Sequence, residues 1–177
     1  LLVVGGDALS RWVDWKDRNS CILFGDGAGA LVLGNADEDE TLSPGFGSGV
    51  LGYSLHSDGA GSKDLSCGFS SSPVVLNTGV SITVPDGEVT VSKGSYEGIS
   101  MNGKKVYQFA TREVPKVLEE AISLAGISDI NKIDHLLLHQ ANIRIMETVA
   151  SRLNIPFEKV ISNLDEHGNT SAGSIPI

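Results

Sequence analysis

Hydrophobic and polar positions along this chain follow two patterns, one typical of strands and the other typical of helices. Short apolar runs predict three buried strands near the start, at residues 1–4, 20–24 and 30–34. The glycine-rich residues 5–7 and 25–29 predict tight turns after the first two strands, in which small residues let the backbones approach. Residues 8–11 fit a short helical turn.

A long polar excursion, rich in glycine, serine and other turn-forming residues, interrupts the pattern between residues 41 and 100. Residues 50–56 alternate between apolar and polar and predict a strand near its beginning. Further on we expect only short β-like pieces, at residues 74–76, 80–84 and 89–91. We therefore interpret most of this region as an elaborated loop.

From residue 101 to residue 126 the pattern becomes helical, with apolar side chains at spacings of three and four. This spacing predicts one long helix with a single apolar face, formed by Val106, Phe109, Ala110, Val114, Val117, Leu118, Ala121, Ile122 and Ala125. We expect Pro115 to kink the helix or to mark a local irregularity, and Gly126 to end it.

The last part of the chain alternates strand and helix. An apolar strand is predicted at residues 133–138, an amphipathic helix at 143–153 and a short strand at 160–162. The buried face of that helix should consist of Met146, Val149, Ala150 and Leu153. Residues 169–171 offer caps for a further helix. Strands that alternate with helices predict an α/β fold.

Composition excludes several classes of function. The net charge of −9 argues against a nucleic-acid-binding protein, which would present a basic face. The two cysteines are too few for a disulfide framework and favour a reducing compartment, and no apolar run is long enough to span a membrane. The glycine stretch at 25–29 lacks the Lys and Ser/Thr of a phosphate-binding loop, and we expect neither a metal site nor a bound cofactor.

Candidate chemistry lies where two predicted strands end. His139 follows the strand at 133–138, and Asn169 follows the next strand along the chain. A strand–helix–strand unit places such ends side by side, so an imidazole N–H and an amide NH2 could both point at one oxygen and stabilise an oxyanion. Taken singly, each residue has a structural alternative, because a buried histidine can satisfy a core hydrogen bond and an asparagine can cap a helix.

Several motifs, in the expected order, resemble those of the β-ketoacyl-[acyl-carrier-protein] synthase III family. They are GDALSR at 6–11, FGDGAGA at 24–30, MNGKKVYQFA at 101–110, HQANIR at 139–144, GNTSA at 168–172 and SIP at 174–176. The resemblance implies a thiolase-like layered αβαβα fold that is incomplete here. Residues 1–100 would end the N-terminal half with an extended loop excursion, and 101–177 would form a truncated C-terminal half.

The resemblance also implies an activity. The family catalyses a decarboxylating Claisen condensation of acetyl-CoA with malonyl-[acyl-carrier-protein], which gives acetoacetyl-[acyl-carrier-protein] and initiates type II fatty acid synthesis. His139 and Asn169 match two members of the family's Cys–His–Asn triad, and both would hold the malonyl thioester oxygen as it becomes an enolate. Neither Cys21 nor Cys67 matches the nucleophilic cysteine, so we expect this chain to be a fragment that is inactive alone.

Binding residues are implied by the same motifs. The segment that binds the acyl carrier protein would comprise Gln140, Ala141, Asn142, Ile143 and Arg144. Arg11 would lie against the adenine of coenzyme A, with Asn142 as a second coenzyme contact, and planar guanidinium stacking suits the first role. The implied partners are acetyl-CoA as substrate, acyl carrier protein and a second copy of the protein, with neither nucleic acid nor membrane.

Two other functions remain open. One is a thiolase-fold acyltransferase that works without decarboxylation, and the other is a non-catalytic homologue that only binds the carrier protein. The retained pair of His139 and Asn169 argues against the second, since a binding module needs neither. The long excursion and the sequence LLLH at 136–139 resemble the plant, algal and cyanobacterial branch. This resemblance suggests the plastid stroma of a chloroplast, with the cytoplasm of a bacterium or cyanobacterium as the alternative.

Overall fold

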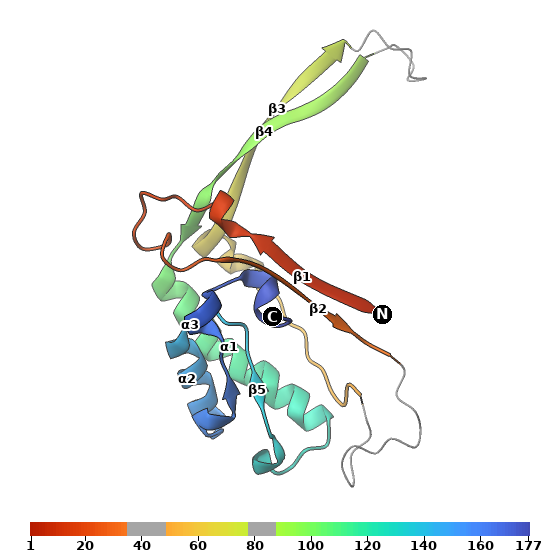
Figure 1. Ribbon diagram of the computed structural model, residues 1–177, viewed down its shortest axis with the longest axis vertical. Coiled ribbons are helices and arrows are strands. Elements are labelled where there is room, and N and C mark those ends of the chain that lie inside the picture. The colour runs from red at the N-terminus through yellow and green to blue at the C-terminus, as the bar shows by residue number, and fades with distance from the viewer. Residues whose placement is uncertain (35–48, 78–87) are drawn as a thin grey trace.

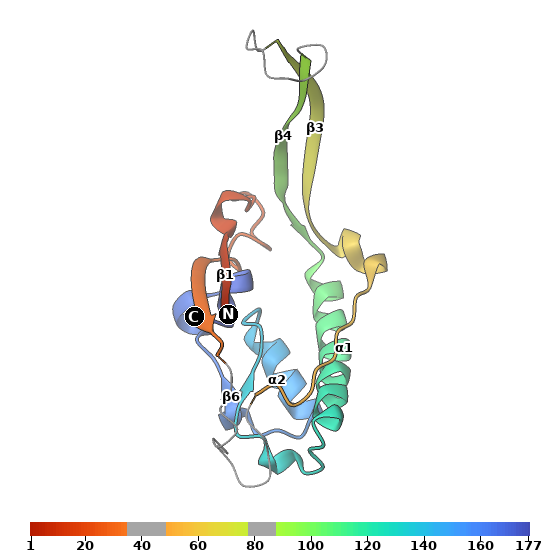
Figure 2. The same cartoon turned by 90° about the vertical axis from the view of Figure 1, so that its right-hand side faces the viewer.

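The computed structural model describes residues 1–34, 49–77 and 88–177 of the chain. Within these ranges, the structure contains three two-stranded sheets and two main helices (Figure 1). One sheet is a long hairpin that projects away from the rest of the molecule, as two perpendicular views show (Figures 1 and 2). The other two sheets and both helices lie together, and they carry the predicted site residues.

The first sheet pairs β1 (Leu2–Ala8) with β2 (Asp26–Val32) in antiparallel register. The predicted turns at 5–7 and 25–29 are therefore wrong, because Gly5 and Gly6 lie within β1 and residues 26–29 lie within β2, which begins directly after Gly25. The predicted strand at 20–24 is also wrong, since this segment consists of turns that end in a single bridge between Phe24 and Asn169. The short helical turn is confirmed as a 3-10 helix, η1 (Leu9–Arg11).

A long antiparallel hairpin, β3 (Leu65–Asn77) and β4 (Glu88–Met101), replaces much of the predicted loop. The β-like pieces at 74–76 and 89–91 fall within these strands, and the piece at 80–84 lies outside the described residues. Before the hairpin comes the 3-10 helix η2 (Gly59–Asp64).

Residues 50–56 form no strand, contrary to our prediction. Their polar side chains bond to helix α1 (Gly103–Leu124) instead of facing a strand partner. Ser54 Oγ donates to a carboxylate oxygen of Glu120 at 2.6 Å, and His56 Nε2 lies 2.7 Å from the same oxygen. In this segment the polar side chains face the helix, whereas Val50, Tyr53 and Leu55 are exposed, so the alternation does not mark a strand with one buried apolar face.

Helix α1 has clear signals at both ends. The side chain of Asn102 caps its start by accepting the backbone N–H three residues further on, at 3.2 Å. The helix continues through Pro115 without interruption. Gly126 ends it as predicted: its φ is +72°, and the N–H of Ile127 donates to the carbonyl of Ile122 at 3.2 Å, which closes the last turn.

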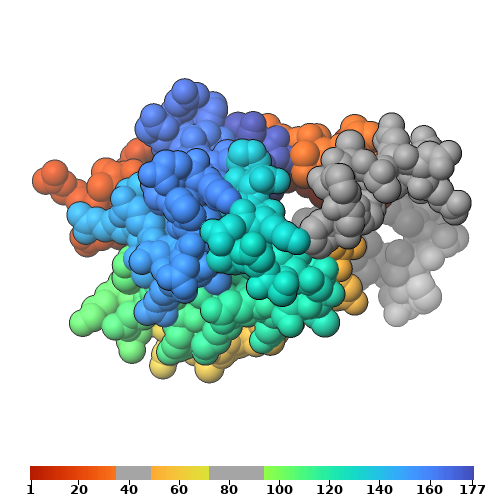
Figure 3. Space-filling view, turned by 90° about the horizontal axis from the view of Figure 1, so that it is seen from below, coloured from red at the N-terminus to blue at the C-terminus, as the bar shows by residue number. Residues whose placement is uncertain are grey.

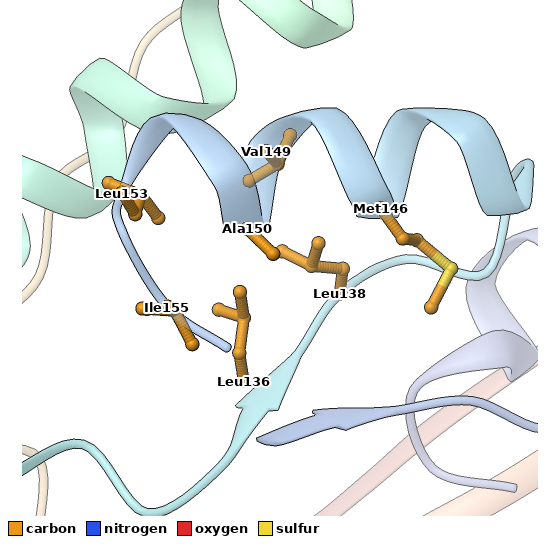
Figure 4. Packing of buried hydrophobic residues seen from close by; sticks show 7 residues of the cluster. All are labelled: Leu136, Leu138, Met146, Val149, Ala150, Leu153 and Ile155. Carbon is orange, nitrogen blue, oxygen red and sulfur yellow. The ribbon is translucent and has the colours of Figure 1, made fainter. Parts of the chain in front are cut away.

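The predicted strand–helix–strand unit is confirmed, with shorter strands than expected. β5 (Leu136–Leu137) and β6 (Val160–Ile161) pair in parallel, and α2 (Ile143–Arg152) connects them. The buried core cluster lies between α2 and β5 (Figure 4) and consists of Leu136, Leu138, Met146, Val149, Ala150, Leu153 and Ile155. Each large apolar side chain buried there stabilises the fold by about 1.5–3 kcal/mol.

Helix α1 packs against this core cluster through Val114 and Leu118. The space-filling view shows α1 and α2 in contact with each other (Figure 3). Two short 3-10 helices, η3 (Ile130–Lys132) and η4 (Phe157–Lys159), precede β5 and β6. Strand and helix alternate in this part of the chain, which confirms the predicted α/β class.

The end of the chain returns to the first sheet. After α3 (Leu164–His167), a short 3-10 helix, η5 (Ser171–Ser174), stands where a further helix was predicted. Asp7 accepts the backbone N–H of Ala172 at 3.1 Å. A Cβ added to Gly5 would lie 2.1 Å from the carbonyl oxygen of Ala172, and one added to Gly29 would lie 2.5 Å from the carbonyl carbon of Pro176. These glycines therefore serve close backbone approach, not turns.

Candidate active site

His139 lies directly after β5, and one of its ring nitrogens is held by a buried serine. The Nδ1 atom is 2.6 Å from Ser174 Oγ, and the backbone N–H of Gln140 donates to the same oxygen at 3.3 Å. Although His139 retains exposed surface, enough atoms surround the ring to desolvate it, and this burial lowers the pKa of His139 below its ordinary value. The ring is therefore neutral near pH 7, and within the described ranges its Nε2 makes no hydrogen bond.

Asn169 does not directly follow β6, as the sequence predicted, but comes after α3 (Leu164–His167), and it is buried, with 9% of its surface exposed. Its backbone is tied to an early segment of the chain: Gly25 N–H donates to Asn169 O at 2.8 Å, and Asn169 N–H donates to Leu23 O at 3.3 Å. Its side-chain Oδ1 accepts the backbone N–H of Ser171 at 2.9 Å. The NH2 end of the amide has no hydrogen-bond partner among the residues that the structure describes, so it remains available as a donor.

One turn of 3-10 helix connects the two candidate residues. Ser171, at the start of η5, holds Asn169, and Ser174, at its end, holds His139. A 3-10 helix rises about 2 Å per residue, so these two anchoring points are about 6 Å apart along its axis. No hydrogen bond joins His139 to Asn169 in the part of the chain that the structure describes. Each residue thus has one polar atom fixed by η5 and one donor nitrogen left without a partner.

Gln140 belongs to the segment that is expected to bind the carrier protein, but its side chain faces inward. It is 1% exposed. Its Nε2 donates to the carbonyls of Leu138 at 2.8 Å and Ile161 at 3.1 Å, and its Oε1 accepts the backbone N–H of Asn163 at 3.2 Å. The side chain therefore clamps the ends of β5 and β6 together and has no surface to offer a partner.

The residues after Gln140 turn toward the surface. Asn142 caps α2 by accepting the backbone N–H of Arg144 at 2.9 Å. Ala141 and Asn142 are half-buried, whereas Ile143 and Arg144 are exposed. The Arg144 guanidinium makes no ion pair within the described ranges. An exposed arginine beside an exposed isoleucine at a helix start offers both charge and apolar surface to an acidic, partly apolar partner.

Arg11 ends η1 beside a group of aromatic side chains that sequence reasoning missed. Its guanidinium carbon lies 5.9 Å from the centre of the Trp12 ring. Trp12 and Tyr96 have ring centroids 4.2 Å apart, and Phe69 and Tyr96 are 5.0 Å apart. These residues line an open pocket of about 630 Å³ at the base of the β3–β4 hairpin. Only the hairpin brings Tyr96 and Phe69 to Trp12, so no local sequence signal could have identified the group.

Three other features of the described ranges bear on function: the state of the cysteines, the grouping of possible metal ligands and the apolar length of the helices. Cys21 is half-buried, and Cys67 is exposed and donates to the carbonyl of Glu97 at 3.4 Å. Within these ranges, no three His, Cys, Asp or Glu side chains are grouped so that they could hold a metal ion. None of the helices described is long and apolar enough to cross a membrane.

Two family profiles match this chain. Residues 125–177 match 3-oxoacyl-[acyl-carrier-protein (ACP)] synthase III C terminal, and residues 1–59 match 3-oxoacyl-[acyl-carrier-protein (ACP)] synthase III. The second match contains Arg11, and the first contains His139 and Asn169.

Individual relatives match along the whole chain. It is 49% identical over 177 residues to the β-ketoacyl-[acyl-carrier-protein] synthase III of Trichodesmium erythraeum, covering 100% of this chain and 48% of that protein. It is 46% identical over 177 residues to the protein of the same name from Porphyra umbilicalis, covering 100% of this chain and 48% of the relative. The chain thus spans about half the length of the curated relatives it matches.

Solved structures give the same picture. The crystal structure of β-ketoacyl-[acyl-carrier-protein] synthase III from Thermus thermophilus matches with a TM-score of 0.75 and 36% identity, over 99% of this chain and 47% of that one. The corresponding protein from Pseudomonas aeruginosa matches with a TM-score of 0.74 and 34% identity, over 99% of this chain and 46% of that one. The chain therefore has the fold of about half of these proteins.

Proposed function

Since this chain belongs to the β-ketoacyl-[acyl-carrier-protein] synthase III family, we propose that it serves as the C-terminal half of a condensing enzyme. The enzyme would join acetyl-CoA and malonyl-[acyl-carrier-protein] into acetoacetyl-[acyl-carrier-protein] and so initiate type II fatty acid synthesis. The thiolase-like fold covers about half the length of the solved relatives. We assign residues 1–100 to the end of the N-terminal half and residues 101–177 to the C-terminal half.

The proposed reaction has three steps. A cysteine thiolate attacks the thioester of acetyl-CoA, which forms an acetyl-cysteine and releases coenzyme A. The malonyl group then loses carbon dioxide, and the electron pair of the broken C–C bond forms an enolate. The enolate carbon attacks the acetyl-cysteine, forms the new C–C bond and expels the thiolate.

His139 and Asn169 act at the second step of this reaction. The Nε2–H of His139 and the Nδ2–H of Asn169 donate to the thioester oxygen as negative charge develops on it. One observation carries this assignment: η5 occupies Nδ1 of His139 and Oδ1 of Asn169, which leaves one donor on each residue. A helix cap or a core hydrogen bond would not require both residues to keep a donor free.

The binding roles follow from exposure. Arg144 and Ile143 offer the charge and apolar surface that an acidic carrier protein would contact, with Ala141 and Asn142 behind them. Arg11 would stack on the adenine of coenzyme A, and Asn142 would make a second coenzyme contact. Gln140 contributes by fixing the strand ends rather than by touching either partner.

Three further features belong to the proposal. The nucleophilic cysteine would come from the part of the relatives' length that this chain does not span, because neither Cys21 nor Cys67 matches it. The enzyme would act as a homodimer. Relatives from cyanobacteria and from the red alga Porphyra umbilicalis support a plastid stroma, or alternatively a bacterial or cyanobacterial cytoplasm.

The test uses the full-length protein and two separable steps. Release of carbon dioxide from malonyl-[acyl-carrier-protein] reports decarboxylation, and transfer of labelled acetyl from acetyl-CoA reports loading of the cysteine. His139→Ala and Asn169→Ala should each lower decarboxylation by about 10²–10³-fold, because each removes one oxyanion donor. Acetyl loading should be preserved. His135→Ala, four residues before His139, replaces an exposed histidine and should match the wild type.

The same assays separate the rival functions. Near-normal decarboxylation in either variant would contradict the donor roles. A wild-type protein that loads acetyl but never decarboxylates malonyl groups would be an acyltransferase without decarboxylation. One that binds carrier protein and does neither would be a non-catalytic homologue.

A further inference from the structure

We propose that Ser174 is a positioning residue that holds His139 in the tautomer with its proton on Nε2. The inference rests on the proposed function, in which Nε2–H is the catalytic donor. Ser174 itself is 2% exposed and lies behind the imidazole, at the end of η5. Because its hydroxyl touches Nδ1 and not the side of the ring that would meet substrate, it would act only through His139.

The direction of the short hydrogen bond follows from the second partner of the hydroxyl. A backbone N–H can only donate, so Gln140 N–H makes Ser174 Oγ an acceptor at 3.3 Å. The hydroxyl hydrogen then needs an acceptor of its own. Nδ1 of His139, at 2.6 Å, is the only other partner of this oxygen within the described ranges. The serine therefore donates to Nδ1.

The opposite direction is unfavourable. If Nδ1 carried the proton and donated to Ser174, the oxygen would accept two hydrogen bonds and its own hydrogen would have no partner in the described part of the chain. A buried hydroxyl hydrogen without an acceptor loses the bond that it makes with water in the unfolded chain. The neutral imidazole carries one proton, so a donating serine at Nδ1 places that proton on Nε2.

Burial supports the same state. A second proton on the ring would have to displace the serine's donated bond, and desolvation already lowers the pKa of His139. The ring thus enters the reaction neutral, with its donor on Nε2. Without the serine, either nitrogen could carry the proton, and only one of the two tautomers would stabilise the enolate.

The first measurement requires no variant. Nitrogen-15 NMR of histidine-labelled full-length protein distinguishes a protonated ring nitrogen from an unprotonated one, and His139 is assigned as the signal lost in His139→Ala. We expect Nε2 protonated and Nδ1 unprotonated near pH 7. A wild-type ring with its proton on Nδ1, or an equal mixture, would overturn the inference whether or not the enzyme is active.

The second measurement uses Ser174→Ala, with Ser151→Ala as the matched control. Ser151 is exposed on α2, and its side chain makes no hydrogen bond within the described ranges. Ser174→Ala should shift His139 toward a mixture of tautomers and lower kcat for malonyl decarboxylation by about 10–100-fold, by analogy with the loss when the group that orients a metal-bound histidine is removed. KM and acetyl loading should stay unchanged, because neither depends on Nε2–H.

The outcomes separate the two proposals. An unchanged tautomer in Ser174→Ala would refute the positioning role, and so would a shifted tautomer with unchanged kcat. A wild-type protein that shows the Nε2–H tautomer but decarboxylates nothing would instead refute the proposed function. If Ser174→Ala fails to fold, the wild-type spectrum remains decisive.

Discussion

Replacing Gln140 with methionine should destabilise the packing of β5 against β6, because the side chain of Gln140 hydrogen-bonds to residues at the ends of both strands. The side chain is 1% exposed, and methionine has a similar length without any polar atom. The substitution therefore removes the clamp while filling nearly the same space. It leaves two carbonyls, of Leu138 and Ile161, and the backbone N–H of Asn163 without the bonds they now make.

The magnitude follows from the burial of each lost bond. The bond to Leu138 O is fully buried, so leaving that carbonyl unpaired costs about 1–3 kcal/mol. The bonds involving Ile161 and Asn163 are partly buried, so water can replace them in part at about 1 kcal/mol each. Together we expect Gln140→Met to lower the free energy of unfolding by about 3–5 kcal/mol, a large share of the ~5–15 kcal/mol that stabilises a typical domain.

Urea unfolding of the full-length protein, followed by circular dichroism, would measure this loss. Gln108→Met is the control, because Gln108 is exposed on α1 and its side chain makes no hydrogen bond within the described ranges. The control should change stability by less than about 0.5 kcal/mol. If the two variants were equally stable, the side chain of Gln140 would not clamp the strands, and its assignment to the interior would be wrong.

Two further substitutions test the packing of the segment after η5 against β2 and the surface of α2. Gly29→Ala should lower the free energy of unfolding by about 1–3 kcal/mol, since its Cβ would lie 2.5 Å from the carbonyl carbon of Pro176. Gly34→Ala is the control in the same urea experiment, and it should be nearly neutral because no atom of the described residues lies within 4 Å of its Cβ. Equal stability of these two variants would contradict the close approach. Arg144→Ala should raise KM for malonyl-[acyl-carrier-protein] about two- to tenfold with little change in kcat, and the difference should shrink at high salt. Arg18→Ala, an exposed arginine elsewhere, serves as its control, and an equal effect of both would indicate general charge rather than a contact.

The parts of the fold that the sequence predicts well are those whose pattern is local. The apolar residues of α2 repeat at helical spacing, and a strongly apolar strand precedes the helix in the chain. The elements between residues 133 and 162 could therefore be predicted from periodicity. The ends of α1 are also local features, because Asn102 caps the helix and Gly126 adopts a positive φ that favours glycine. Strand lengths were less predictable, since pairing partners decide where a ladder stops.

The errors arise where tertiary contacts decide the structure. Gly5 and Gly29 predict turns when only neighbouring residues are considered. In the structure their lack of a side chain makes room for the backbone of Ala172 and of Pro176, respectively. The alternation at 50–56 resembles that of a strand. Only the structure shows that Ser54 and His56 of this segment bond to Glu120 of α1. The sequence could not predict which way the side chain of Gln140 points. The same local sequence would allow this glutamine either to clamp two strands or to contact a partner.

The candidate site and the glycine-rich sheet are therefore one structural unit. Gly5 of β1 lies against Ala172 of η5, and Gly29 of β2 lies against Pro176, just after η5, so closely that neither glycine leaves room for a Cβ. Asp7 also holds the backbone of η5 at Ala172. The polar atoms of the same short helix hold His139 and Asn169. A 3-10 helix of four residues has little stability of its own, so its position is set by the sheet beneath it. Substitutions on β1 or β2 that lift η5 should thus misplace both donors together, and decarboxylation should fall more than acetyl loading in Gly29→Ala.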